Sequence, residues 1–411
     1  MASYDISPAS GAGAKLPHPV ELICFALIVT NAVALIVCYL HGWWLVPAPD
    51  GSGNIADFVA LWAAGRLAEA GHAAAAYNWA VLKPLEENIV GHFAGYLGWR
   101  YPPTFLFAAA ALSLLPYAAA FLVWTFGTFL AYLAAIRTII GDRAGYFLAA
   151  AFPAVLANFM AGQNGFLSAA LIGGSLGLLE DRPVAAGALL GLLAYKPHLG
   201  LLFPIALAAA GRWRVFFSAA LVAVLTAAAS WAAFGAASWQ AFFPGIAHAL
   251  DADGLAYWGK LQSAFGLTRA LYDSATLAWS IQIATALLAA VAVAVLWRSR
   301  AAYEIKAAAL GVAVLLATPH LLLYDLVVLA VPLAFLFRLG RSGGYLKHEL
   351  AGIGLACLLV LIYPLVQAPV GFVAVLIVAA LVVRRALDPA SYAAASNQNA
   401  PAVKLNRWVT S

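Results

Sequence analysis

The chain has 411 residues, of which 65% are hydrophobic and only 9% are charged. Soluble domains carry about 25% charged residues, so this composition excludes an ordinary soluble enzyme. A net charge of +5 would suggest nucleic acid as the partner of a soluble protein. Here, however, the Lys and Arg residues cluster between apolar runs, which is typical of a protein that crosses a membrane many times.

The apolar stretches predict helices. They recur at membrane-spanning length from Pro19 to Val383, and in hydrocarbon only helices and closed barrels satisfy their own backbone hydrogen bonds. Richness in Ala and Leu without two-residue alternation favours helices. We therefore predict an all-α integral membrane protein, a polytopic bundle of about 12 transmembrane helices with amphipathic helices in the first outer loop.

The predicted organisation is simple. Residues 1–18 form a polar cytosolic segment, and the apolar run that follows, Val20–Leu40, is an uncleaved first helix rather than a signal peptide. Residues 19–385 form a single transmembrane domain, with a first outer loop at 43–101 and a second large outer loop at 235–274. Residues 386–411 are polar and form a cytosolic tail.

Basic loops give the topology. Placing all of them in the cytoplasm is consistent with the positive-inside rule and leaves both termini cytoplasmic. The loops are Arg137–Arg143, Arg182, Arg212–Arg214, Arg298–Arg300, Arg338–Lys347 and Arg384–Arg385. Between Tyr101 and Arg137 this topology requires an odd number of crossings, so we expect a kinked single span or a half-crossing element, broken at Pro116.

The segment from Arg182 to Arg212 must cross twice with fewer than 30 residues, whereas one full span takes about 20. Its central turn, Tyr195–His198, is therefore expected to lie recessed below the membrane surface. Lys196 in such a turn either binds an anion, for which a phosphate is the natural partner, or loses its charge. Snorkelling of Lys196 to the interface is the alternative.

Other polar residues at the outer ends of helices are candidates with structural alternatives. Asp57 is either a functional carboxylate or a helix N-cap. Gln163 and Asn164, which glycines flank, suit sugar hydroxyls or form a plain helix connector. His320 and Tyr324 are expected to share a helix face, and His320 could bind a phosphate or a hydroxyl or be structural.

Asp325 is expected to orient a partner or to bond across helices. Tyr101 precedes two prolines that suit a helix start. The pair Asp251 and Asp253 is too weak a signal for a metal site, and no nucleotide-binding or hydrolase motif occurs in a supporting context.

Together these motifs resemble glycosyltransferase family 87 from about Trp43 to Phe337. The resemblance rests on their order: Asn54-Ile55-Ala56-Asp57-Phe58, Tyr77, Tyr101-Pro102-Pro103, Gly162-Gln163-Asn164, Ala186-Gly187, Tyr195-Lys196-Pro197-His198, Arg212-Trp213-Arg214, Thr318-Pro319-His320 and Tyr324-Asp325. It implies a GT-C-like bundle in the bacterial inner membrane with a periplasmic site, similar to the mannosyltransferases and arabinofuranosyltransferases of the cell envelope that use polyprenyl-phosphate sugars.

The resemblance also implies roles. Asp57 would be the catalytic base of an inverting transfer, and Lys196 and His320 would bind the donor phosphate. Sugar or acceptor would contact Gln163, Asn164, His198, Tyr324 and Tyr101. The expected partners are a polyprenyl-phosphate sugar, with mannose favoured, a glycolipid or polysaccharide acceptor, and membrane lipid, but not nucleic acid. We expect no cofactor, assign no metal ligand and leave dependence on a divalent metal open.

Two other functions remain open from the sequence. A transporter or flippase would place ionisable groups at mid-depth and on both sides of the membrane, whereas here they favour the outer end. A non-catalytic envelope assembly protein would tolerate the loss of Asp57.

Overall fold

The structure is a computed structural model, which describes residues 18–41, 56–93, 97–256, 260–272 and 274–388. Its elements are α1 (His18–His41), α2 (Phe58–Glu69), η1 (Ala73–Tyr77), α3 (Trp79–Val90), η2 (Pro103–Phe105), α4 (Leu106–Ser113), α5 (Tyr117–Ile140), α6 (Ala144–Ala150), α7 (Ala154–Ala161), α8 (Gly165–Leu178), α9 (Pro183–Leu192), η3 (Leu193–Tyr195), α10 (Pro197–Gly200), α11 (Phe203–Ala209), α12 (Trp213–Ala256), α13 (Ala264–Leu271), α14 (Ala275–Arg298), α15 (Tyr303–Ala317), η5 (Leu323–Leu329), α16 (Ala330–Gly343), α17 (Glu349–Val366) and α18 (Val370–Leu387). The predicted cytosolic segments lie almost wholly outside the described residues.

The prediction of an all-α polytopic membrane protein is confirmed. Within the described ranges there is no strand, and seven helices are long and apolar enough to cross a membrane. An eighth span results if α6 and α7, which are bent by 65°, are one broken span. Four shorter apolar helices, Pro103–Ser113, Gly165–Leu178, Pro183–Tyr195 and Pro197–Ala209, accompany them, and a count of about twelve requires these also to cross.

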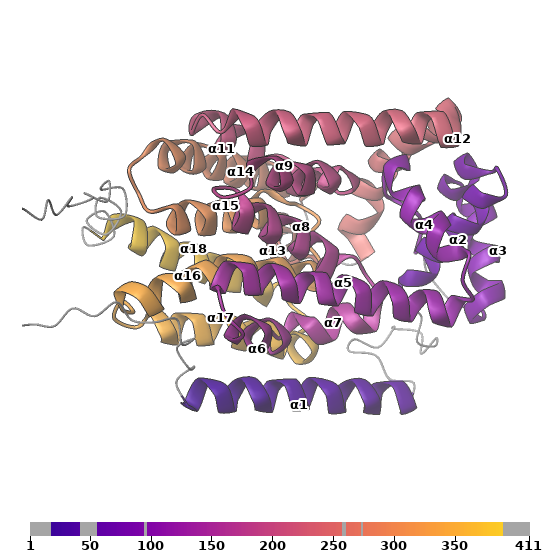
Figure 1. Ribbon diagram of the computed structural model, residues 1–411. Helices are drawn as coiled ribbons and strands as arrows, with labels where there is room; N and C mark the ends of the chain where they lie inside the picture. Colours follow the sequence, from indigo (N-terminus) through magenta and orange to yellow (C-terminus); the bar gives the residue numbers. More distant parts are fainter. Residues whose placement is uncertain (1–17, 42–55, 94–96, 257–259, 273, 389–411) are drawn as a thin grey trace, which may run out of the picture.

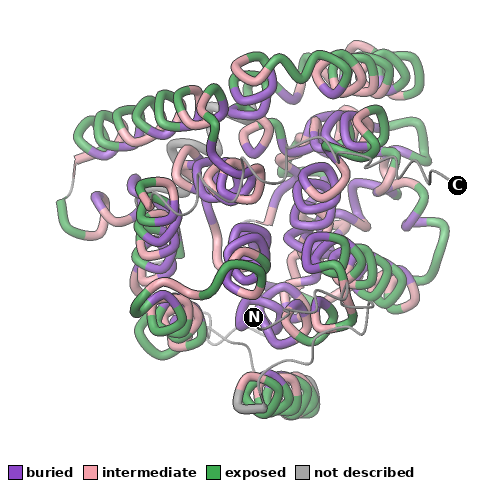
Figure 2. The backbone as a smooth tube through the Cα atoms, turned by 60° about the vertical axis from the view of Figure 1, so that its left-hand side comes forward, coloured by how far each residue is buried: buried purple, intermediate pink, exposed green. Residues whose placement is uncertain are grey.

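Burial separates a central layer from a lipid-facing one. The span Leu323–Gly343 is 78% buried, whereas only 11% of the apolar window of Trp213–Pro244 is buried. Figure 2 shows the buried residues gathered in the middle of the bundle and exposed residues along the outer helices. Exposed apolar side chains such as Leu221 and Val224 on α12 are stable there because hydrocarbon, not water, surrounds them.

The basic loops meet at one end of the bundle. Arg338 donates to the carbonyl of Ile139, and Arg341 pairs with Asp142 at 2.8 Å. Arg384 donates to the carbonyl of Lys347. In Figure 1 this end lies on the left, and α2, α3 and α4 lie at the other. Loops far apart in sequence thus share one side, as the positive-inside pattern predicts.

The two irregular segments fold as short pieces. Between Tyr101 and Pro116 the chain forms only η2 and α4, and α4 packs against α2. The single long helix α5 follows Pro116. Between Arg182 and Arg212 the chain forms short helices on either side of Lys196, whose side chain is only 6% exposed. Tyr195 and Lys196 of the turn are thus buried in protein, where irregular backbone is tolerated, whereas Pro197 is exposed.

One expectation is wrong. His320 and Tyr324 do not share a helix face, because α15 ends at Ala317 and the next helical residue is Leu323. Pro319 disfavours the helical conformation at the residue before it, and Thr318 is extended with φ −88° and ψ 115°. The Asp325 carboxylate then accepts a hydrogen bond from the Leu322 amide and starts η5.

A substitution at Gly65 on α2 tests the close packing of α2 against α4. A Cβ at this position would lie 2.1 Å from the carbonyl oxygen of Ala109 on α4. We expect Gly65→Ala to lower stability by about 1–3 kcal/mol, because the backbone of α4 must shift. Thermal unfolding in one detergent measures this. The matched change Gly127→Ala, which meets no atom within 4 Å inside α5, should keep or slightly raise stability. Equal behaviour of the two variants would contradict the close packing.

Candidate functional site

Asp57 lies at the start of α2 but does not cap it. Its side chain forms no cap hydrogen bond with the helix. Instead, Oδ2 accepts a hydrogen bond from Nε2 of Gln163 at 3.1 Å, across 106 positions of sequence. The capping alternative is thus not what the structure shows, and the carboxylate faces the 162–165 turn.

Glycines shape this turn. Gly162 ends α7 with φ +61°, a left-handed conformation that favours glycine, and its carbonyl accepts from the Trp124 indole at 3.0 Å. A Cβ at Gly165 would lie 2.1 Å from the carbonyl oxygen of Tyr324. The turn therefore packs its backbone directly against η5, which brings the 162–165 and 320–325 motifs together.

Tyr101 holds the Gln163 amide in place. Its hydroxyl donates to Oε1 of Gln163 at 3.0 Å, so that Nε2 is the end directed at Asp57. The carbonyl of Tyr101 accepts from the hydroxyl of Tyr77 at 2.8 Å. A chain of hydrogen bonds thus runs from η1 through Tyr101 and Gln163 to the carboxylate.

Lys196 is buried and paired. Its ammonium donates to Oδ1 of Asn164 at 3.0 Å and to the carboxylate of Asp325, which is only 1% exposed. The ring of Tyr324 lies 5.6 Å from the ammonium. Lys196 therefore does not snorkel to the interface, and its charge is balanced inside the protein.

The two carboxylate centres are neighbours. Gln163, which contacts Asp57, is adjacent in sequence to Asn164, which contacts Lys196. Tyr101 is within electrostatic range of both Asp57 and Asp325. One short turn therefore links a carboxylate near the first outer loop to a buried ion pair.

His198 and His320 border the ion pair. His198 is within electrostatic range of Lys196 and of His320, so the structure brings the three predicted basic residues together. The ring of His320 lies 5.9 Å from that of Phe265 and 6.3 Å from that of Trp279, which holds it among aromatic side chains. Their predicted roles in binding phosphate or sugar stay predictions.

Several polar atoms in this region have unused hydrogen-bonding capacity. Among the described residues, Nδ2 of Asn164, Nδ2 of Asn158 and Nε2 of His198 are buried without a hydrogen-bond partner. Buried polar atoms normally have one, so these three atoms retain capacity for a hydrogen bond.

Tyr195 supports the site and was not predicted. Its hydroxyl lies 2.7 Å from that of Ser168 and donates to the carbonyl of Asn164. Its ring stacks on Phe105 with the centroids 4.5 Å apart. The aromatic ring beside Lys196 thus fixes the recessed turn against both η2 and α8.

Glu86 is a second carboxyl that the prediction missed. It is completely buried on α3, and neither carboxylate oxygen has a hydrogen-bond partner in the described part of the chain. Burial raises the pKa of Glu86 to about 7, Lys83 opposes this rise, and Glu87 and Asp57 add to it. Glu86 follows the buried Leu82 by four residues, and this helical spacing could have shown that it is on the apolar face.

The protein environment shifts the pKa of the Asp57 carboxyl. Burial raises its pKa above the ordinary value, and the hydrogen bond from Gln163 and the charges of Lys260 and Arg100 oppose the rise. In the described segments, no group of three or more His, Cys, Asp or Glu residues could hold a metal ion. The arrangement can take up a proton at Asp57 and stabilise negative charge near Lys196.

A family model described as Glycosyltransferase family 87 matches residues 99–319. No curated protein and no solved structure matches the chain. The matched residues include Tyr101, Gln163, Lys196 and the start of the 318–325 motif, whereas Asp57 and Glu86 precede them.

The raised pKa of Glu86 predicts that the stability of the folded protein depends on pH. Its pKa rises from 4.5 to about 7 on folding, so between these pH values the folded protein keeps a proton that the unfolded chain has released. Stability should fall by about 3 kcal/mol from pH 4.5 to pH 7 through this group alone. Glu86→Gln cannot ionise, so its stability relative to the wild type should rise over this range.

Thermal unfolding in nanodiscs from pH 4.5 to pH 8 measures the difference. Glu87→Gln is the matched control, because hydrogen bonding at Phe93 and the charges of Lys83 and His92 lower the pKa of Glu87 despite its desolvation. Its relative stability should not rise with pH. A constant difference between Glu86→Gln and the wild type would show that Glu86 does not titrate as described.

Proposed function

The chain belongs to glycosyltransferase family 87 and is a membrane glycosyltransferase; from this premise we propose that it transfers a sugar, mannose by preference, from a polyprenyl-phosphate donor to an envelope glycolipid or glycan. The site is proposed to face the periplasmic side of a bacterial inner membrane. The observation that carries the proposal is the Asp57–Gln163 contact beside the buried Lys196–Asp325 pair.

Asp57 is the proposed general base. It removes the proton from an acceptor hydroxyl, whose oxygen attacks the anomeric carbon of the donor sugar. The bond from that carbon to the phosphate oxygen breaks, its electron pair leaves with the phosphate, and the configuration inverts. General-base assistance of this kind typically contributes about 10²–10⁴-fold.

The environment of Asp57 suits this role. Burial raises the pKa of its carboxyl, which makes it a better proton acceptor once ionised. The Gln163 amide limits the rise by donating to the carboxylate. Because Tyr101 fixes Gln163, the network orients the carboxylate as well as tuning it.

Lys196 is proposed to stabilise the departing phosphate. An ammonium group has three donors, and within the described residues Lys196 uses two of them in hydrogen bonds, to Asn164 and Asp325. Asp325 would act as the residue that positions Lys196. His198 and His320 would assist at the phosphate, and electrostatic stabilisation of this type is strongest where water is excluded.

The sugar hydroxyls are proposed to bind at the other polar atoms of the site. Nδ2 of Asn164 and Nε2 of His198 are buried with unused hydrogen-bonding capacity. Tyr101 and Tyr324 provide ring faces and hydroxyls nearby. The basic loops at the opposite end of the bundle support the proposed periplasmic position, because such loops favour the cytoplasm.

Asp57→Asn is expected to abolish transfer while leaving the fold intact, because the amide keeps the shape but cannot accept the proton. We expect a loss of about 10²-fold or more, measured with synthetic polyprenyl-phosphate sugars and envelope extract in nanodiscs. Asp181→Asn, in an exposed turn at the basic end, is the matched control and should retain activity. Equal transfer by both variants would remove Asp57 as the base.

Gln163→Leu should change the pH dependence of transfer. Loss of the amide hydrogen bond raises the pKa of Asp57 further, so the acid limb of kcat/KM should move to higher pH. A pH profile of the wild type and the variant measures this shift. Phe159→Leu, a change on α7 at a ring that packs against Phe126 and Phe129, controls for altered packing. An unmoved limb in Gln163→Leu would show that the bond does not tune the base.

Variants of Lys196 and Asp325 can distinguish a structural role of Lys196 from a catalytic one. Lys196→Gln alone should cost about 3–5 kcal/mol of stability, because it leaves Asp325 buried without its partner. Lys196→Gln combined with Asp325→Asn removes both charges and should recover much of this loss. If Lys196 stabilises the phosphate, the double variant remains inactive although folded. Recovered transfer would limit the pair to a structural role.

A further inference from the structure

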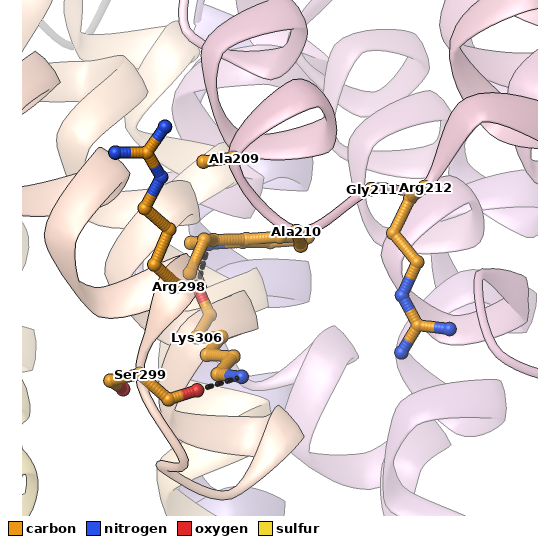
Figure 3. A pocket seen from close by; sticks show the side chains of 8 residues that line it. Ala209, Ala210, Gly211, Arg212, Arg298, Ser299 and Lys306 are labelled. Carbon is orange, nitrogen blue, oxygen red and sulfur yellow. Dashed lines mark hydrogen bonds between the residues drawn. The ribbon is translucent and has the colours of Figure 1, made fainter.

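Two turns border an open pocket of 420 Å³ at the end of the bundle opposite α2, which Asp57 precedes. One turn joins α11 to α12 and the other joins α14 to α15. The lining residues are Ala209, Ala210, Gly211, Arg212, Trp297, Arg298, Ser299 and Lys306. In Figure 3, Arg212 and Lys306 approach the pocket from opposite sides, and Arg298 extends away from both.

The lining carries more positive than negative charge. Arg212 pairs with Glu180 at 2.9 Å, an exposed contact that uses only one edge of the guanidinium. The ammonium of Lys306 donates to the carbonyl of Ser299 at 2.8 Å, which leaves two further donors. Arg298 is exposed and forms no ion pair with any described residue. The three cations therefore retain donors for an anion.

Apolar side chains lie under the pocket and beside it. Trp297 is 2% exposed and donates its indole N–H to the carbonyl of Lys306, so it forms a fixed floor. Beside the cations, Trp213 on α12 and Val295 on α14 are 50% and 65% exposed. These helices face lipid along most of their length. An occupant with an anionic head and an apolar tail would thus contact both kinds of surface.

We propose that this pocket binds the phosphate headgroup of an anionic membrane lipid, with its acyl chains along α12 and α14. Guanidinium and ammonium groups are strong partners for phosphate oxygens. Basic pockets between transmembrane helices at a membrane surface are suited to anionic headgroups. Because the pocket is at the end opposite Asp57, this binding is independent of the proposed transfer reaction.

The test is thermal unfolding of the purified full chain in detergent during titration with dioleoylphosphatidylglycerol, and with dioleoylphosphatidylcholine as the neutral-headgroup comparison. We expect phosphatidylglycerol to raise the unfolding midpoint of the wild type and phosphatidylcholine to have little effect. In Arg212→Gln/Lys306→Gln the apparent affinity should fall about fivefold for each cation removed. Arg300→Gln is the matched control and should behave as the wild type. Arg300 is exposed in the turn between α14 and α15 but does not line the pocket.

Three outcomes would overturn the proposal. One is an equal effect of phosphatidylglycerol on the wild type and the double variant. Another is stabilisation by inorganic phosphate alone to the same extent, which would indicate a site for a soluble anion. The third is an equal effect of the two lipids. Should the double variant not fold, Lys306→Gln alone replaces it, and the expected loss is about fivefold.

Discussion

The buried contact between Lys196 and Asp325 constrains the rest of the site. Neither charge is stable alone in a protein interior surrounded by hydrocarbon, so the recessed turn and η5 must be held against each other. Asn164 completes the contact from a third segment. The hydrogen bonds of the Lys196 ammonium group thereby hold together three segments that are far apart in sequence, those of Asn164, Lys196 and Asp325.

Glycine positions make this convergence possible. Gly165 allows the backbone of the 162–165 turn to touch the carbonyl of Tyr324, and Gly162 adopts a left-handed conformation to end α7. The Asn158 side chain accepts from the Gly165 amide at 2.9 Å and closes the turn. A side chain at Gly165 would push η5 away, which would move Asp325 and with it Lys196.

The sequence was sufficient for the fold class, because it follows from how much apolar chain a bilayer requires, and it singled out Lys196, which the structure buries. It was insufficient for the 318–325 segment, where Pro319 and the Asp325–Leu322 hydrogen bond interrupt the expected helix. The partner of Asp57 lies 106 residues away, and no local pattern predicts such a contact. Glu86 was missed because only its helical spacing from Leu82 indicates that it is buried. The adjacent Glu87 is more exposed, so the pair resembles a polar surface segment.

The adjacency of Gln163 and Asn164 has a mechanistic consequence for the proposed reaction. One residue orients the base and the next orients the group proposed to receive the leaving phosphate. The two groups must act on opposite sides of one anomeric carbon, so their separation matters as much as their individual strength. A shared turn of backbone holds that separation constant. Because Tyr101, which precedes η2, and Tyr195 in η3 brace the same turn, a shift of this turn would reach the base and the ion pair together rather than one at a time.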